Sequence, residues 1–109
     1  MGLDITIKQK HIIRCSECGN FVEARIVSEV HSGGRAWYPF LESVGYYVPY
    51  DKRTEENDCY GRDMELTKEQ SDRLFRYCKD NEVYNYHEVV SLVAVAEAMG
   101  DAVVINADW

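Results

Sequence analysis

The sequence has few residues that interrupt regular structure and no long apolar run. Its 109 residues include two prolines and seven glycines, and no stretch approaches the roughly 18 apolar residues that a membrane-spanning helix needs. The N-terminus carries no apolar signal core. We therefore expect neither export nor a membrane span. A composition that is 46% hydrophobic and 28% charged predicts one globular domain over residues 1–109, located in the cytoplasm.

Basic residues are scarce, above all near the C-terminus. The net charge is −7, and residues 83–109 hold four acidic residues but no lysine or arginine. Direct binding of nucleic acid needs a basic stripe that meets the phosphates, so the composition argues against it. An acidic surface suits a basic protein partner, and such partners often handle nucleic acid themselves. Solubility alone is the competing explanation for the acidity.

Catalytic sequence motifs are also missing. The pair His87-Glu88 resembles the start of a His-Glu-x-x-His metal motif, but Ser91 stands where the second histidine belongs. The sequence has no Gly-x-Ser-x-Gly, no phosphate-binding loop and no Gly-x-Gly-x-x-Gly. We therefore expect a protein without enzymatic activity. The less favoured alternative is a small metal-dependent hydrolase or nuclease that uses zinc or the pair Asp58-Cys59 together with His31 or His87.

The two ends of the chain predict strands. Apolar and polar side chains alternate over residues 3–7, a period of two that indicates a half-buried strand. We expect two further strands over residues 11–15 and 21–30, the latter ending at the turn residues 31–34. A last strand is expected over residues 102–106, where it can pair beside the first.

Two helices are predicted in the second half of the chain. Thr67 and Gln70 have the spacing of a capping box, which predicts a helix over about 68–79. A second helix is expected over 86–99, with Gly100 as its left-handed end. The prediction is an α+β fold, in which a small antiparallel sheet of N-terminal strands plus a C-terminal strand is packed by the two C-terminal helices.

The predicted helix 86–99 has very little polar surface. Most of its residues are valine, leucine, alanine or methionine, without the polar face that a surface helix carries. Such a helix is either central in the core or partly covered by another chain. We therefore also predict a homodimer that forms through this helix.

The cysteine pattern predicts a metal knuckle. Cys15-x-x-Cys18-Gly19 lies between two strand-like segments, and a tight turn with this spacing points two thiolates at one ion. Cys78 lies on an apolar helix stripe and is expected to be an inert buried thiol. His11 and His87 are further residues that can complete such a site, and a plain hairpin turn is the alternative. The candidate ligands of the predicted structural zinc are Cys15, Cys18, Cys59 and His31.

An aromatic and irregular stretch is the better functional lead. Residues 35–62 hold seven of the thirteen aromatic residues, Pro39 and Pro49 discourage long regular elements there, and one short strand is expected around Gly45–Val48. Tyrosine-rich loops are good recognition surfaces, and acidic residues follow these tyrosines at once. The alternative is that the tyrosines only pack the loop onto the sheet. The predicted partner-binding residues are Tyr46, Tyr47, Tyr50, Asp51, Glu55, Glu56, Asp58, Tyr60 and Asp63.

Three segments carry a resemblance to a known group of proteins. They are Met1-Gly2-Leu3-Asp4-Ile5, then Glu56-Asn57-Asp58-Cys59-Tyr60-Gly61, and Glu65-Leu66-Thr67-Lys68-Glu69-Gln70 leading into a helix with Cys78. The sequence resembles small uncharacterised phage and prophage proteins that begin Met-Gly-Leu-Asp, in which an acidic Asp-Cys-Gly loop precedes a similarly capped helix. The resemblance implies an origin in a phage or mobile element, and hence a location in the host-cell cytoplasm.

These observations favour a protein that binds another protein. We expect a phage-type module that blocks a host protein, such as a nucleic-acid-handling defence protein, in the manner of anti-CRISPR or anti-restriction inhibitors. The alternative is a zinc-stabilised structural or assembly protein without inhibitory action. Neither function involves a membrane or direct contact with nucleic acid.

Overall fold

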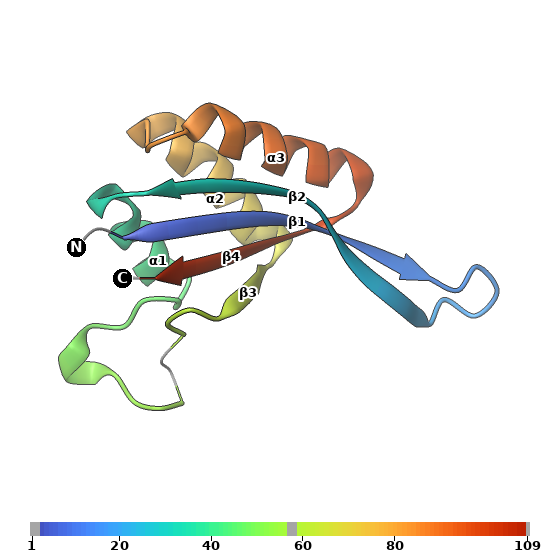
Figure 1. Ribbon diagram of the computed structural model, residues 1–109, viewed down its shortest axis with the longest axis horizontal. Helices are drawn as coiled ribbons and strands as arrows, with labels where there is room; N and C mark the ends of the chain where they lie inside the picture. The colour runs from blue at the N-terminus through green and yellow to red at the C-terminus, as the bar shows by residue number, and fades with distance from the viewer. Residues whose placement is uncertain (1–2, 57–58, 109) are drawn as a thin grey trace.

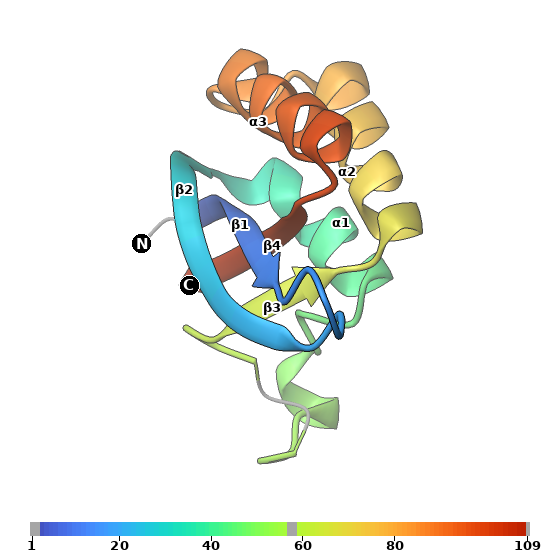
Figure 2. The ribbon, with the colours of Figure 1, turned by 90° about the vertical axis from the view of Figure 1, so that its right-hand side faces the viewer.

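The computed structural model describes residues 3–56 and 59–108, apart from the side chains of Phe21 and Tyr50. Four antiparallel strands form one sheet in the order β2-β1-β4-β3, and α2 and α3 cover one side of it (Figure 1 and Figure 2). The predicted α+β fold is therefore confirmed. The elements in chain order are β1 (Asp4–Arg14), β2 (Phe21–Gly33), η1 (Arg35–Trp37), α1 (Tyr38–Ser43), η2 (Tyr50–Lys52), β3 (Asp63–Leu66), α2 (Lys68–Asn81), α3 (Tyr86–Met99) and β4 (Ala102–Asp108).

The sheet is built around the strand nearest the N-terminus. β1 pairs with β2 on one side and with β4 on the other, so the predicted pairing of the last strand beside the first is confirmed. The separate strands expected over 3–7 and 11–15 are one continuous strand, and its pairing with β2 shifts register between Gln9 and Lys10. β2 runs on to Gly33, beyond the expected end, because its residues near 31–33 still pair with the start of β1.

The core lies between the sheet and the helices. Ile5, Ile7 and Ile105 on the sheet are buried in one cluster with Leu74 of α2 and Val89 of α3. Full burial of such a side chain stabilises the fold by about 1.5–3 kcal/mol. The largest fully buried side chains are Trp37, Tyr46 and Phe40, so the aromatic stretch supplies part of the core.

Both predicted helices are present, and only the end of α2 differs, because α2 continues to Asn81 and not to 79. The Thr67 hydroxyl accepts a hydrogen bond from the Gln70 N–H at 3.1 Å, and the Gln70 side chain accepts one from the Thr67 N–H at 2.9 Å. This reciprocal pair fixes the start of α2. α3 ends at Gly100, whose φ of 71° is the left-handed conformation that favours glycine. In the described part of the chain, none of the helices has the length and apolar character needed to cross a bilayer.

The middle of the chain differs from the prediction. The prediction of a short strand around Gly45–Val48 is wrong, because Gly45 has a φ of 78° and the chain turns there after α1. Helix α1 was not predicted, although Pro39 in its first turn fits a helix start. Strand β3 was not predicted either, because four residues are too few to show a clear alternation.

The hairpin of β1 and β2 extends beyond the rest of the sheet. β1 pairs with β4 only as far as Lys10, whereas its pairing with β2 continues to Arg14. The outer half of the hairpin therefore has no third strand, and it projects from the body as an arm (Figure 1). Val22, Ile26 and Val27 of this arm are exposed. A two-stranded ribbon is marginally stable by itself, so exposed apolar side chains on it suggest an interaction surface.

Candidate functional site

Tyr46 closes the loop that connects α1 to β3. Its side chain is 0% exposed, and its hydroxyl donates to the Arg62 carbonyl at 2.7 Å and accepts from the Ala107 N–H at 2.8 Å. The Gly61 N–H also donates to the Ala107 carbonyl at 2.8 Å. Both ends of the loop 47–62 are thus held on the end of β4. The prediction that Tyr46 contacts a partner is wrong, because burial in the core leaves its side chain no partner-facing surface.

The closed loop presents acidic side chains to solvent. Asp51, Glu55 and Glu56 are exposed. Tyr60 is 47% exposed, and its hydrogen bond to the Asp108 carboxylate raises the pKa of the phenol. The predicted residues Tyr50, by its side chain, and Asp58, as a whole, lie outside the described residues.

Tyr47 and Arg53 give the loop internal structure. The Tyr47 ring packs edge-on against Tyr38, with the ring centroids 4.9 Å apart. The Arg53 guanidinium lies 5.5 Å from the Tyr47 ring centroid and donates to the Val48 carbonyl at 3.0 and 3.2 Å. Tyr47 is half-buried and helps to shape the loop, and contact of its remaining surface with a partner stays a prediction.

Asp63 lies at the end of the loop, where β3 begins. It accepts a hydrogen bond from the Asn106 amide at 2.9 Å and from the Lys8 ammonium at 3.2 Å. The Asn106 hydrogen bond, then Lys8, hold the pKa of this carboxyl below its usual value. Asp63 is thus charged and about half exposed, but Lys8 offsets its charge. Among the predicted binding residues, the exposed acids of the loop are better placed to attract a basic partner.

The cysteine pair forms a tight turn at the tip of the arm. The Gly19 N–H donates to the Cys15 carbonyl at 2.8 Å, and the Cys15 N–H donates to the Asn20 carbonyl at 2.8 Å. Hydrogen bonding from the Cys18 backbone, then from the Cys18 thiol and the Glu17 backbone, lowers the pKa of Cys15. The predicted turn is confirmed, and both thiols lie at one spot.

The four candidate zinc ligands do not meet within one chain. His31 pairs with Thr6 in the sheet, and Thr6 lies nine residues before Cys15, which is roughly 30 Å along a strand. Cys59 packs at the end of β4, next to Tyr46. Across residues 3–56 and 59–108, no group of three His, Cys, Asp or Glu side chains lies close enough to hold a metal. Structural zinc therefore stays a prediction, centred on the pair Cys15 and Cys18.

The residues of the hydrolase alternative lie on separate elements. Cys59 belongs to the loop, His31 to β2, and His87 to the first turn of α3. The His31 ring lies 3.3 Å from the Thr6 hydroxyl, and the His87 ring packs on Tyr86 with centroids 4.0 Å apart. These placements supply no support for joint action of the three residues, and the alternative stays a prediction.

A buried carboxylate was missed in the sequence. Asp101 follows Gly100 at the corner between α3 and β4, and its side chain is 2% exposed. One oxygen lies 2.7 Å from His11 Nδ1, and the other accepts from the Gln9 amide at 2.6 Å. The hydrogen bond to His11, then that to Gln9, lower the pKa of Asp101. Because Asp101 lies 90 positions from His11 and 92 from Gln9, no local pattern could have joined it to them.

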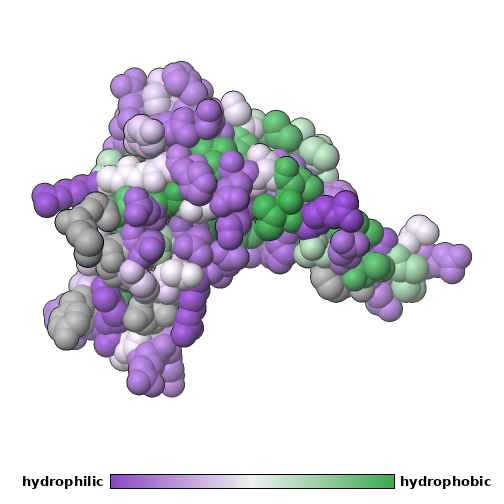
Figure 3. Space-filling model, viewed as in Figure 1, coloured by the Kyte–Doolittle hydropathy of each residue, from purple (hydrophilic) through white to green (hydrophobic). Residues whose placement is uncertain are grey.

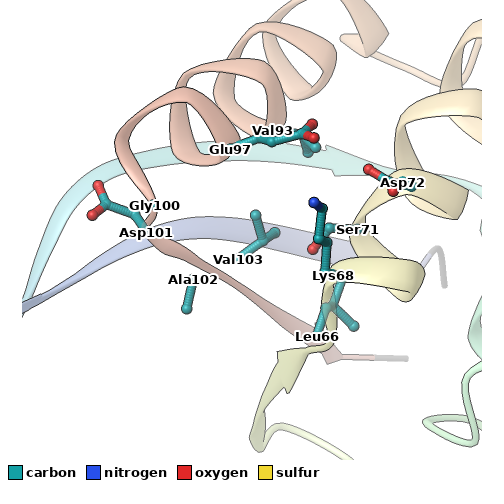
Figure 4. A pocket seen from close by; sticks show the side chains of 10 residues that line it. All are labelled: Leu66, Lys68, Ser71, Asp72, Val93, Glu97, Gly100, Asp101, Ala102 and Val103. Carbon is teal, nitrogen blue, oxygen red and sulfur yellow. The ribbon is translucent and has the colours of Figure 1, made fainter.

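A shallow cleft separates the start of α2 from the end of α3. It has a volume of about 320 Å³, and Figure 4 shows Asp72 and Glu97 facing it from the two helices. Lys68 is the one base among its described lining residues, while Val93 and Val103 form its apolar wall. The lining combines the Lys68 ammonium with three carboxylates, those of Asp72, Glu97 and Asp101, but the sequence patterns did not point to this cleft.

Comparisons of this chain with protein-family models, with curated proteins and with solved structures found no match. The site is therefore argued from the residues of this chain alone.

Proposed function

We propose that this chain is an acidic protein-binding module that contacts a basic partner through the loop 47–62. The observation that carries this proposal is the closure of a sixteen-residue loop by the buried Tyr46 hydroxyl, while Asp51, Glu55 and Glu56 of the loop face solvent. Compact loops with closed ends are frequently functional, and loops this long are uncommon without a role.

Closure of the loop favours binding because it lowers the entropy that a partner must remove. A loop that is free at one end would have to be ordered on contact, which reduces affinity. Here the Tyr46 hydroxyl, the Gly61 amide and Arg53 hold the loop before any partner arrives. Tyr60 adds an aromatic contact beside the exposed carboxylates.

The charge of the chain selects the class of partner. At −7, with no lysine or arginine in residues 83–109, the chain attracts basic proteins and repels nucleic acid. We place the partner among nucleic-acid-handling proteins, because their basic grooves accept a surface that imitates phosphate charge. The resemblance to phage proteins supports a host defence protein as the target, met in the host-cell cytoplasm.

The dependence of partner capture on salt concentration tests this proposal directly. The immobilised protein is incubated with a bacterial lysate that has been cleared of nucleic acid, at low and at high ionic strength, and the captured proteins are identified by mass spectrometry. We expect basic nucleic-acid-handling proteins to be enriched over the lysate at low salt and lost at high salt, since salt screens exposed charges. Capture of no such protein at low salt would contradict the proposal.

A structural or assembly role is the second candidate function. One face of α3 packs into the core through Val89, Leu92 and Val93, while Val95 and Met99 of the same helix are exposed. Figure 3 shows hydrophobic surface over the end of α3 and at the root of the arm. The homodimer predicted through helix 86–99 would cover this surface.

The dimer through α3 is tested by the concentration dependence of the molar mass, measured by light scattering with the protein in excess chelator. We expect a mass that rises with concentration for the natural chain and stays at one chain for the double variant Val95→Gln, Met99→Gln. A natural chain that remains a monomer at the highest concentration would rule out assembly through this face.

A further inference from the structure

The tip of the arm is the place in the described fold where two thiols lie together. We propose that Cys15 and Cys18 form half of a tetrahedral zinc site and that a second copy of this chain supplies the other half. One zinc ion then joins two arms tip to tip. This inference goes beyond the proposed function, because it involves neither the acidic loop nor its partner.

The turn already has the geometry that a zinc half-site requires. Gly19 has a φ of 71°, which lets the chain fold back over the two cysteines. The Gly19 N–H donates to the Cys15 carbonyl at 2.8 Å, and this hydrogen bond closes the turn that brings the two cysteines together. Cysteine sulfur is a preferred ligand of structural zinc. The Cys18 side chain is exposed and Cys15 is half-buried, so an ion can reach both.

The same chain cannot complete the site from its described residues. Zinc–sulfur bonds are about 2.3 Å long, so four ligands must lie within a few ångströms of one another. Cys78 is fully buried in the core, and Cys59 packs at the opposite end of β4 from the arm. The nearest histidine in the sequence is His11, whose Nδ1 atom is hydrogen-bonded to the Asp101 carboxylate. His11 also lies four residues from Cys15, which is roughly 13 Å along the strand.

A second copy completes the site by symmetry. Two thiolates are half of the four ligands of a closed structural zinc site, and a twofold axis through the ion supplies the other two. Figure 1 shows the arm projecting from the sheet and helices, so two tips can meet while the two bodies stay apart. The longest dimension of the chain, 48 Å against 33 and 22 Å, reflects this projection.

The tip holds one basic and one acidic side chain, Arg14 and Glu17. Each of four thiols releases one proton to solvent when it binds, and zinc stays in the 2+ state, so the four-thiolate complex carries two negative charges. Arg14 lies beside the turn, and its Nη1 atom donates to the Gly19 carbonyl at 3.5 Å. Each copy therefore brings one Arg14 and one Glu17 to the complex, so these two side chains add no net charge to it.

The test is a titration of the full chain with zinc. The protein is reduced, stripped of metal with a chelator, and titrated with Zn²⁺ while bound metal and molar mass are measured together. We expect one zinc for every two chains, a molar mass that rises when zinc is added, and reversal of that rise by excess chelator. With Co²⁺ as the probe, we expect the absorption of a tetrahedral four-thiolate centre.

Matched cysteine variants locate the site. Cys15→Ser and Cys18→Ser are each expected to lose zinc binding and the zinc-dependent dimer, while Cys59→Ser keeps both. Circular dichroism checks that the variants fold, which we expect because the tip is remote from the core. One zinc per monomer, a molar mass that zinc leaves unchanged, or a natural chain that binds no zinc when its thiols are shown to be reduced would each overturn the proposal.

Discussion

At the scale of single residues, the hydroxyl of Tyr46 has the most connected role in the candidate site. It joins the end of the loop at Arg62 to β4 at Ala107 from within the core. A tyrosine with this burial shapes the loop from below. In the function that we propose, the contact surface therefore belongs to its exposed neighbours.

Removal of this hydroxyl tests its role. We expect Tyr46→Phe to lower the free energy of unfolding by about 1–3 kcal/mol, because the buried Ala107 N–H and the Arg62 carbonyl lose their partner. Tyr84→Phe is the control, since the Tyr84 side chain is 74% exposed, and we expect it to change stability by less than about 0.5 kcal/mol. Urea denaturation measures both. Equal effects would show that the Tyr46 hydroxyl holds nothing in place.

The buried Asp101 predicts a dependence of stability on pH. Its pKa lies below the ordinary value of 3.8 in the folded chain because of its hydrogen bonds to His11 and Gln9. The folded state therefore binds fewer protons than the unfolded state, so this contribution is present above about pH 3.8 and is lost as pH falls through the lower folded value.

Substitution of Asp101 checks this sign. We expect the natural chain to lose stability between pH 5 and pH 2 more steeply than Asp101→Asn, when urea midpoints are compared across that range. Asp80→Asn removes one exposed carboxylate and is the charge-matched control. If Asp101→Asn followed the same pH dependence as the natural chain, the carboxylate would have no special role in the fold.

At the scale of elements, the arm differs from the rest of the sheet because a third strand supports only half of the hairpin. β1 has β4 beside it from Asp4 to Lys10, and from there to Arg14 it has only β2.

The rate at which backbone amides exchange with deuterium should change where β4 ends beside β1. We expect the amides at residues 5–9 to exchange much more slowly than those at 11–14, and added zinc to slow only the second group. Uniform protection along β1 would contradict an independent arm.

Local signals explain which elements could be predicted. The capping pair Thr67 and Gln70 and the terminal Gly100 fix helix ends through neighbours a few residues away, so the sequence was sufficient there. Strand β3 and the closure of the loop depend on pairing with β4, some 40 to 60 residues later. Such contacts leave no periodic pattern in the chain. For that reason Tyr46 was predicted on the surface, and the pair of His11 and Asp101 was not predicted.

At the scale of the whole molecule, the fold separates three surfaces. The acidic loop lies at one end, the arm with its cysteine tip extends from the other, and the exposed part of α3 lies over the sheet (Figure 1). A partner at the loop therefore leaves the tip of the arm accessible. A zinc-joined pair would present two loops, and avidity would strengthen binding to a partner with repeated sites.

The central claim is that exposed acids of the loop, rather than net charge alone, bind a basic protein. The most direct measurement compares the dissociation constants of two charge-matched triple variants for the basic protein captured at low salt. One variant carries Asp51→Asn, Glu55→Gln and Glu56→Gln in the loop. The other carries Glu42→Gln, Asp80→Asn and Glu82→Gln, which are exposed elsewhere. We expect the loop variant to bind roughly tenfold more weakly than the other. Equal affinities would contradict the claim, and solubility would then be the explanation for the acidity of the chain.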